Sequence, residues 1–259
     1  MRIAVLSDIH GNATALAAAA AQVEALSPDH LVILGDLLTY GPDVAEVFDR
    51  LDALASRFET SWIWGNHEEI YDDLAKGQRD YLDSVADWVR QSVEHTAEGV
   101  DVSRLRRIPW ARELETEGLL FAHANPFGDW RYVNSVADHA ESAERLHERG
   151  FHAGVFGHTH RSRLYAHPRG TGATDDHPRT ESLGKAGDEV VVANAGSVGQ
   201  PRNRTATSTF LTIDVSPSAY AFDIHTVAYD VHQHVASVLA LPLPAATTQR
   251  LAGFFHTGE

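Results

Sequence analysis

Side chains that can bind metal ions or transfer protons follow five separate apolar stretches of the sequence. They are Asp8 with His10, Asp36, Asn66 with His67 and Glu68, His123, and His158 with His160. Asn offers a neutral oxygen to a metal, His can bind a metal or donate a proton, and Glu can hold an imidazole in one tautomer. Chance can supply one or two such groups, but five indicate a site.

The spacing within these groups favours two metal ions. Asp8 and His10 are two residues apart, so both side chains can converge on one ion from an extended loop. His158 and His160 share this spacing, which lets each imidazole reach a different ion of a pair. Asp36 can bridge the two ions. Carboxylates mixed with imidazoles suit Mn²⁺, Fe or Zn²⁺ better than Ca²⁺ or Mg²⁺.

Such a pair of ions predicts phosphoryl chemistry. Two divalent ions about 3.5–4 Å apart can bind the attacking and leaving oxygens of an in-line displacement, and can lower the pKa of a bound water to about 7. The reaction also needs an acid for the departing oxygen. His67, which adjoins the candidate ligand Asn66 and precedes Glu68, is the residue that we expect in this role.

The five groups require strands that bring them together. We expect strands over 2–7, 30–34, 60–64, 118–122 and 152–156. We expect helices over Ala13–Leu26, about 43–56 and 135–149. Strands that alternate with helices imply a parallel sheet with right-handed crossovers, and loops at the carboxyl ends of such strands commonly form sites.

The rest of the chain is expected to complete a single domain over residues 1–259. Residues 69–112 suggest a helical insertion rich in charged and aromatic residues. The β-rich stretches 163–167, 189–193, 208–215 and 220–227 suggest antiparallel strands, with a mobile loop at 168–188. A helix is expected over 230–241 and a loosely attached C-terminal tail over 242–259.

Composition excludes several classes of function. The 259 residues include no cysteine, which removes disulfides, thiolate metal sites and cysteine nucleophiles. A formal net charge of −15 argues against a partner made of duplex nucleic acid, because phosphate backbones are bound by clustered Lys and Arg. No apolar stretch approaches the length that spans a membrane, so we expect a cytoplasmic protein. From the pair of metal ions, we expect it to act on a small phosphoester or nucleotide.

Taken in order, these groups resemble the five sequence blocks of the calcineurin-like metallophosphoesterase superfamily. The blocks are Asp8-Ile9-His10, Gly35-Asp36, Gly65-Asn66-His67-Glu68, His123 and Gly157-His158-Thr159-His160. Tyr40-Gly41-Pro42 and residues 194–202 further resemble the small bacterial and archaeal phosphodiesterase-like branch. One departure is Ala124, where relatives usually have Gly after the histidine.

The resemblance implies an α/β fold of the α+β kind, a four-layer αββα sandwich of two mixed sheets flanked by helices. It implies that Asp8, His10 and His160 bind one metal, that Asp36 bridges, and that Asn66, His123 and His158 bind the other. It gives His67 the leaving-group or phosphate-contacting role. Asn12 either caps the first helix or contacts the phosphate. Arg202 is either a phosphate clamp or a solvated surface residue.

Several functions remain open at this point. The stretch from Leu37 to Gly41 contains no arginine clamp of the kind found in the protein phosphatases of the superfamily, which favours phosphodiesters over phosphomonoesters. A phosphomonoesterase, a dinucleoside polyphosphate hydrolase and a non-catalytic scaffold for protein partners are the alternatives. The ligands accept two divalent or trivalent ions among Mn, Fe, Zn and Ni, of which we expect Mn to support activity in vitro. The sequence leaves open whether the protein is a homo-oligomer.

Overall fold

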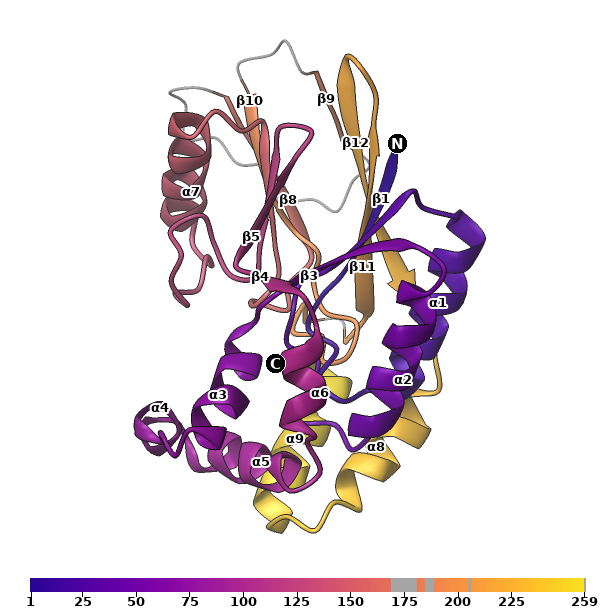
Figure 1. Cartoon of the computed structure of the whole chain (residues 1–259), viewed down its shortest axis with the longest axis vertical. Helices are drawn as coiled ribbons and strands as arrows, with labels where there is room; N and C mark the ends of the chain where they lie inside the picture. Colours follow the sequence, from indigo (N-terminus) through magenta and orange to yellow (C-terminus); the bar gives the residue numbers. More distant parts are fainter. Residues whose placement is uncertain (169–180, 185–188, 205, 259) are drawn as a thin grey trace.

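Two mixed β-sheets form the centre of the molecule, and helices cover their outer faces (Figure 1). The computed structural model describes residues 1–168, 181–184, 189–204 and 206–258. The seven-stranded sheet has the order β4-β3-β2-β1-β11-β12-β9. Its strands are β1 (Arg2–Leu6), β2 (His30–Ile33), β3 (Glu59–Ile63), β4 (Trp110–Ala111), β9 (Glu181–Gly184), β11 (Ser208–Val215) and β12 (Ala219–Val227). Strands β1 to β4 run parallel, and β11 joins β1 in the antiparallel sense.

The five-stranded sheet has the order β5-β6-β7-β10-β8. Its strands are β5 (Glu113–Thr116), β6 (Leu119–Ala122), β7 (Ala153–Phe156), β8 (Arg163–Pro168) and β10 (Glu189–Asn194). Strand β7 is parallel to both β6 and β10, and antiparallel strands close the two edges. The carboxyl ends of β6 and β7 therefore lie at the same end of this sheet.

Alternation of side chains along the strands explains the layers. In β1, Ile3 and Val5 belong to the apolar core between the sheets, which also contains Phe121 and Val155 of the other sheet. Ala4 and Leu6 face the opposite way, toward the helices. Because successive strand residues point to opposite faces, both faces of β1 are buried.

Helices cover both outer faces of the sheets. Helices α1 (Ala13–Leu26) and α2 (Val44–Ala55) pack on the seven-stranded sheet through residues such as Leu16 and Val47. Helix α7 (Val136–Glu148) packs on the five-stranded sheet, where Leu146 contacts the apolar cluster that includes Phe156. The expected αββα sandwich is confirmed (Figure 1).

A second group of helices lies at the end of the molecule below the sheets in Figure 1. It comprises α3 (Asn66–Ala75), α4 (Asp80–Ser84), α5 (Asp87–Ala97), α6 (Val102–Arg107), α8 (Val231–Leu239) and α9 (Ala245–Thr257). The first four lie within or just before the expected insertion. Helices α8 and α9 contact each other, and α9 also contacts α5.

Two expectations for the second half of the chain need correction. The expected tail over 242–259 is wrong for the described residues, because α9 buries Leu251, Phe254 and Phe255, which share one helical face. Residues 169–180 and 185–188 of the expected loop lie outside the described residues, whereas 181–184 form β9 and pair with β12. In the described part of the chain, no helix is both long and apolar enough to span a membrane.

Candidate dinuclear metal centre

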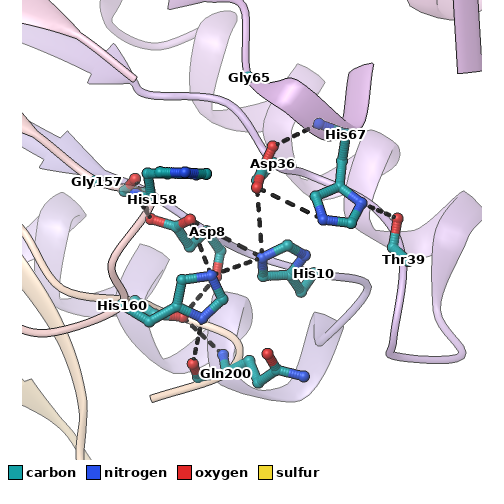
Figure 2. Close-up of polar contacts among 12 residues, drawn as sticks. Asp8, His10, Asp36, Thr39, Gly65, His67, Gly157, His158, His160 and Gln200 are labelled. Atoms are coloured by element: carbon teal, nitrogen blue, oxygen red, sulfur yellow. Dashed lines mark hydrogen bonds and ion pairs between the residues drawn. The ribbon is translucent and has the colours of Figure 1, made fainter. Parts of the chain in front are cut away.

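The seven side chains expected to bind metal come together at the carboxyl ends of three parallel strands of one sheet and two parallel strands of the other. Figure 2 shows Asp8, His10, Asp36, His158 and His160 in this cluster. Asp8 and His10 follow β1, Asp36 follows β2, Asn66 begins α3 after β3, His123 follows β6, and His158 and His160 follow β7. Each of them is at most 7% exposed. So many ionisable groups are rarely buried together unless they are paired or bind a metal.

The ligand atoms form two groups that share one carboxylate. Asp8, His10, Asp36 and His160 can place one ligand atom each within 4.8 Å of all the others, and so can Asp36, His123 and His158. The Oδ1 atom of Asn66 lies 3.2 Å from Nε2 of His123 and so joins the second group. Asp36 belongs to both groups, so it is the residue that could bridge two ions.

The hydrogen bonds of the two histidines in the first group favour a bound cation. Nδ1 of His10 lies 2.9 Å from the carbonyl oxygen of Leu38, and Nδ1 of His160 lies 2.7 Å from that of Gln200. Because a carbonyl only accepts, both Nδ1 atoms carry the proton and both Nε2 atoms present lone pairs. These two Nε2 atoms lie only 3.1 Å apart, an arrangement that a shared cation stabilises.

Asp8 supports the same conclusion. Its Oδ1 atom is buried and finds no hydrogen-bond donor in the described part of the chain, although it lies 3.2 Å from Nε2 of His160. Burial raises the pKa of this carboxyl, and burial lowers the pKa of both His10 and His160 well below the usual value. A metal ion bound between these residues would supply the positive charge that the neutral imidazoles lack.

The second group has the same design. Nδ1 of His123 contacts the carbonyl of Leu34, and Nε2 of His158 lies 2.9 Å from the carbonyl of Trp130, so each ring directs its other nitrogen to the centre. Burial lowers the pKa of His123, but Asp36 outweighs it and raises the value to about 10. Burial and the neighbouring His123 lower the pKa of His158 to about 3. Ala124 does not displace His123 from the centre.

Unusual backbone conformations aim several of these side chains. Asp8, His10, Asp36, His158 and His160 all have φ between 48° and 64°, in the left-handed region. Few residues other than Gly adopt this conformation, and each instance costs about 1–2 kcal/mol. Its concentration in five of the ligands indicates a functional site, where such strain commonly occurs.

Two glycines allow the ligand loops to approach each other. A Cβ atom on Gly157 would lie 2.6 Å from Oδ2 of Asp8, and one on Gly65 would lie 2.6 Å from the backbone nitrogen of Asp36. Without these side chains, the backbone N–H of His158 donates to Oδ2 of Asp8 at 3.0 Å. The loop after β7 thereby fixes a ligand that follows β1 (Figure 2).

The imidazole of His67 lies at the edge of the centre. Its Nε2 atom is 3.9 Å from Oδ2 of Asp36 and 3.3 Å from the hydroxyl of Tyr40, while its backbone N–H donates to Oδ1 of Asp36. Burial lowers its pKa, although Asp36 acts in the opposite direction. On the other side of the ring, Nδ1 contacts the hydroxyl of Thr39 at 2.8 Å (Figure 2).

The expectation that Glu68 orients an imidazole is wrong. Its carboxylate accepts from the backbone N–H groups of Asp36, Leu37 and Gly65 at 2.8 to 3.0 Å. Burial and the nearby Asp36 raise its pKa to about 7. Glu68 therefore holds the loop that carries the bridging ligand. Thr39, which the sequence pattern does not single out, contacts Nδ1 of His67.

The two expected substrate contacts have different outcomes. Asn12 caps α1, because its Oδ1 accepts from the backbone of Ala15 while its Nδ2 donates to the carbonyl of Gly199. Both polar groups of its side chain thus have partners within the chain, which favours the capping role over a contact with phosphate. Arg202 lies near the centre, where its charge lowers the pKa of His67 and His160, and it stays a candidate.

Comparisons with known proteins agree with this geometry. The calcineurin-like phosphoesterase superfamily domain matches residues 1–218. An uncharacterised protein of Methanocaldococcus jannaschii is 25% identical over 267 residues, which cover 96% of each chain.

Two solved structures share the fold. The crystal structure of a metallophosphoesterase from Sphaerobacter thermophilus has a TM-score of 0.75 and 23% identity, covering 100% of this chain and 99% of the other. A hypothetical protein from Pyrococcus horikoshii has a TM-score of 0.76 and 18% identity, covering 100% and 98%. Because the family model spans most of the sequence and its blocks contain the ligands described above, this chain belongs to the calcineurin-like phosphoesterase superfamily.

Proposed function

We propose that this protein is a metal-dependent phosphodiesterase for small phosphodiesters or nucleotides. The observation that carries this proposal is the pair of ligand groups that share Asp36, with the imidazole of His67 directed toward the same carboxylate. The superfamily supports hydrolysis of a phosphoric ester. The preference for diesters and the choice of metal are our own inferences.

We assign each part of the reaction to the metal ions or to a residue near them. When bound, two metal ions supply Lewis acidity and a nucleophile at neutral pH. We assign His67 to protonate the departing oxygen, and the 3.9 Å between its Nε2 atom and Oδ2 of Asp36 supports this assignment. The guanidinium of Arg202, held by Oε1 of Gln200 at 2.6 Å, is placed to contact a phosphate oxygen.

The limited positive charge near the centre supports a diester. Leu37 and Leu38, which follow the bridging Asp36, are fully buried and apolar. The charge of Arg202 lowers the pKa values of His67, His160 and Tyr40 and is the main arginine contribution to each of them. A phosphodiester carries one negative charge and a phosphomonoester carries up to two, so a centre with few cations favours the diester.

Hydrolysis of matched chromogenic esters tests the proposal. The protein is freed of metal with a chelator, reloaded separately with Mn²⁺, Fe²⁺, Ni²⁺ or Zn²⁺, and assayed with bis(4-nitrophenyl) phosphate and 4-nitrophenyl phosphate. We expect Mn²⁺ to support activity and the diester to have the higher kcat/KM. Asp36→Asn should prevent metal loading, whereas His67→Ala should bind metal normally and lower kcat by about 10²-fold or more.

The exposed His232 supplies a matched control, because His232→Ala removes an imidazole that is distant in sequence from all the candidate metal ligands. Turnover that is unchanged in both Asp36→Asn and His67→Ala would contradict the proposal. Faster hydrolysis of the monoester would favour a phosphomonoesterase. A protein that binds two ions but hydrolyses neither ester nor a dinucleoside polyphosphate would favour a scaffold for protein partners.

A further inference from the structure

A chain of buried hydroxyl groups holds the imidazole of His67. The Oγ1 atom of Thr39 lies 2.8 Å from Nδ1 of His67 and 2.6 Å from the hydroxyl of Tyr71, which in turn contacts the side chain of Thr96. All four residues are at most 5% exposed. His67 and Tyr71 are four residues apart on α3, so they project from the same face of that helix.

The type of partner distinguishes His67 from the histidines of the metal centre. His10, His123, His158 and His160 each contact a backbone carbonyl, which can only accept and so fixes a single tautomer suited to a metal ligand. His67 contacts a hydroxyl, which can accept from Nδ1–H or donate to a bare Nδ1. The ring therefore keeps its orientation whichever nitrogen carries the proton.

The backbone of Thr39 adds an independent observation. Its φ is 79°, in the left-handed region that β-branched residues rarely adopt, and the next residue, Tyr40, has φ of 70°. The loop between Asp36 and Gly41 thus maintains a strained conformation at the position whose hydroxyl contacts His67. Strain of this kind persists where the surrounding contacts impose it and is commonly found at functional sites.

We propose that Thr39, supported by Tyr71, is a positioning residue that aims Nε2 of His67 at the departing oxygen of the substrate. The proposal rests on the phosphoesterase function proposed above. It assigns Thr39 no contact with substrate or metal, because its hydroxyl lies on the far side of the ring from Asp36 (Figure 2).

The test compares Thr39→Val, which keeps the branched shape but removes the hydroxyl, with Thr39→Ser, which keeps the hydroxyl. Each variant is loaded with Mn²⁺ and assayed on diesters that release 4-nitrophenol, a good leaving group, or phenol, a poor one. Proton donation matters most for the poor leaving group. We expect Thr39→Val to lower kcat by roughly tenfold or more for the phenyl ester and by much less for the nitrophenyl ester.

Two further variants and measurements separate positioning from simple damage to the fold. Thr39→Ser should restore the wild-type dependence on the leaving group, and Tyr71→Phe should show the same trend as Thr39→Val but more weakly. Mn²⁺ affinity, measured by calorimetry, should equal that of the wild type in all variants. In a background of His67→Ala, Thr39→Val should cause no additional loss.

The possible failures are distinguishable. A wild-type protein without activity on any ester would remove the proposed function itself. An active wild type whose Thr39→Val variant loses the same factor on both esters, or loses nothing, would overturn the positioning role. Equal losses by Thr39→Val in the presence and absence of the His67 imidazole would also overturn it.

Discussion

Replacement of Gly157 by alanine tests whether the close approach of two loops holds Asp8 in its ligand position. A Cβ atom at Gly157 would lie 2.6 Å from Oδ2 of Asp8 and closer still to Oγ of Ser7. Because real Cβ atoms keep at least 3.0 Å from such atoms, the Asp8 carboxylate must shift by at least about 0.4 Å and the Ser7 hydroxyl by more, or the loops that carry them must separate. The contacts of Asp8 with Ser7 and with the backbone of His158 would then be lost or lengthened.

We expect Gly157→Ala to lower both the stability of the protein and its affinity for metal. Overpacking of a buried site costs about 1–3 kcal/mol, which corresponds to a decrease in melting temperature of about 2–12 °C for a protein of this size. Loss of the contacts that orient a ligand typically lowers metal affinity by about 10–100-fold. Competition with a chelating dye measures the affinity, and circular dichroism with and without chelator measures the melting temperature.

Gly253→Ala is the matched control. A Cβ atom at Gly253 in α9 would have no atom within 4 Å, so this variant should bind metal normally and be stabilised by about 0.5–1 kcal/mol through helix propensity. If Gly157→Ala loads both ions with wild-type affinity and melts at the wild-type temperature, the loops do not constrain Asp8, and the reasoning is refuted.

Three further predictions concern the second ion, pH and the C-terminal helix. Asn66→Ala should reduce the number of tightly bound Mn²⁺ ions from about two to one, because Asn66 belongs to the second ligand group only; elemental analysis after gel filtration measures this. In the metal-free protein, the pKa of His123 is about 10 against 6.5 in the unfolded chain, so its contribution to stability is complete below pH 6.5 and lost as pH rises through about 10. Urea unfolding in chelator should show this decrease, and His123→Gln should remove it. Leu251→Ala should destabilise the protein by about 2–5 kcal/mol in the same assay, whereas a loosely attached tail would tolerate the change.

The clustering of the candidate metal ligands could be predicted because each of them follows an apolar strand in the sequence. Strands β1, β2 and β3 are parallel neighbours, so the positions of Asp8, Asp36 and Asn66 after these strands already implied that they share one edge. The partners of His67 could not be predicted in the same way. Thr39 meets α3 only because the loop after Asp36 adopts a left-handed backbone, which sequence periodicity does not indicate.

Other errors have identifiable physical causes. Glu68 is a polar residue beside a ligand, and its type fits a catalytic role as well as a structural one; only the buried backbone N–H groups that donate to its side chain distinguish the two roles. For Asn12, the sequence left the helix cap and the phosphate contact open, and its hydrogen bond from Ala15 favours the cap. The tail was expected because Pro242 and Pro244 interrupt the chain after α8. The spacing of Leu251, Phe254 and Phe255 was the signal for α9. The i, i+4 spacing of His67 and Tyr71 indicated that they share one face of a helix, and both contact Thr39 from that face.

Each ligand group draws on both sheets, and this has a consequence for stability beyond catalysis. The first group combines Asp8, His10 and Asp36 from the seven-stranded sheet with His160 from the other, and the second combines Asp36 and Asn66 with His123 and His158. Bound ions would therefore link the two sheets at one end of the sandwich. A free metal concentration of 100 times the dissociation constant would add about 2.7 kcal/mol per site to the free energy of unfolding. Scarcity of metal in the cell would thus lower the stability of the folded protein in addition to removing the proposed activity.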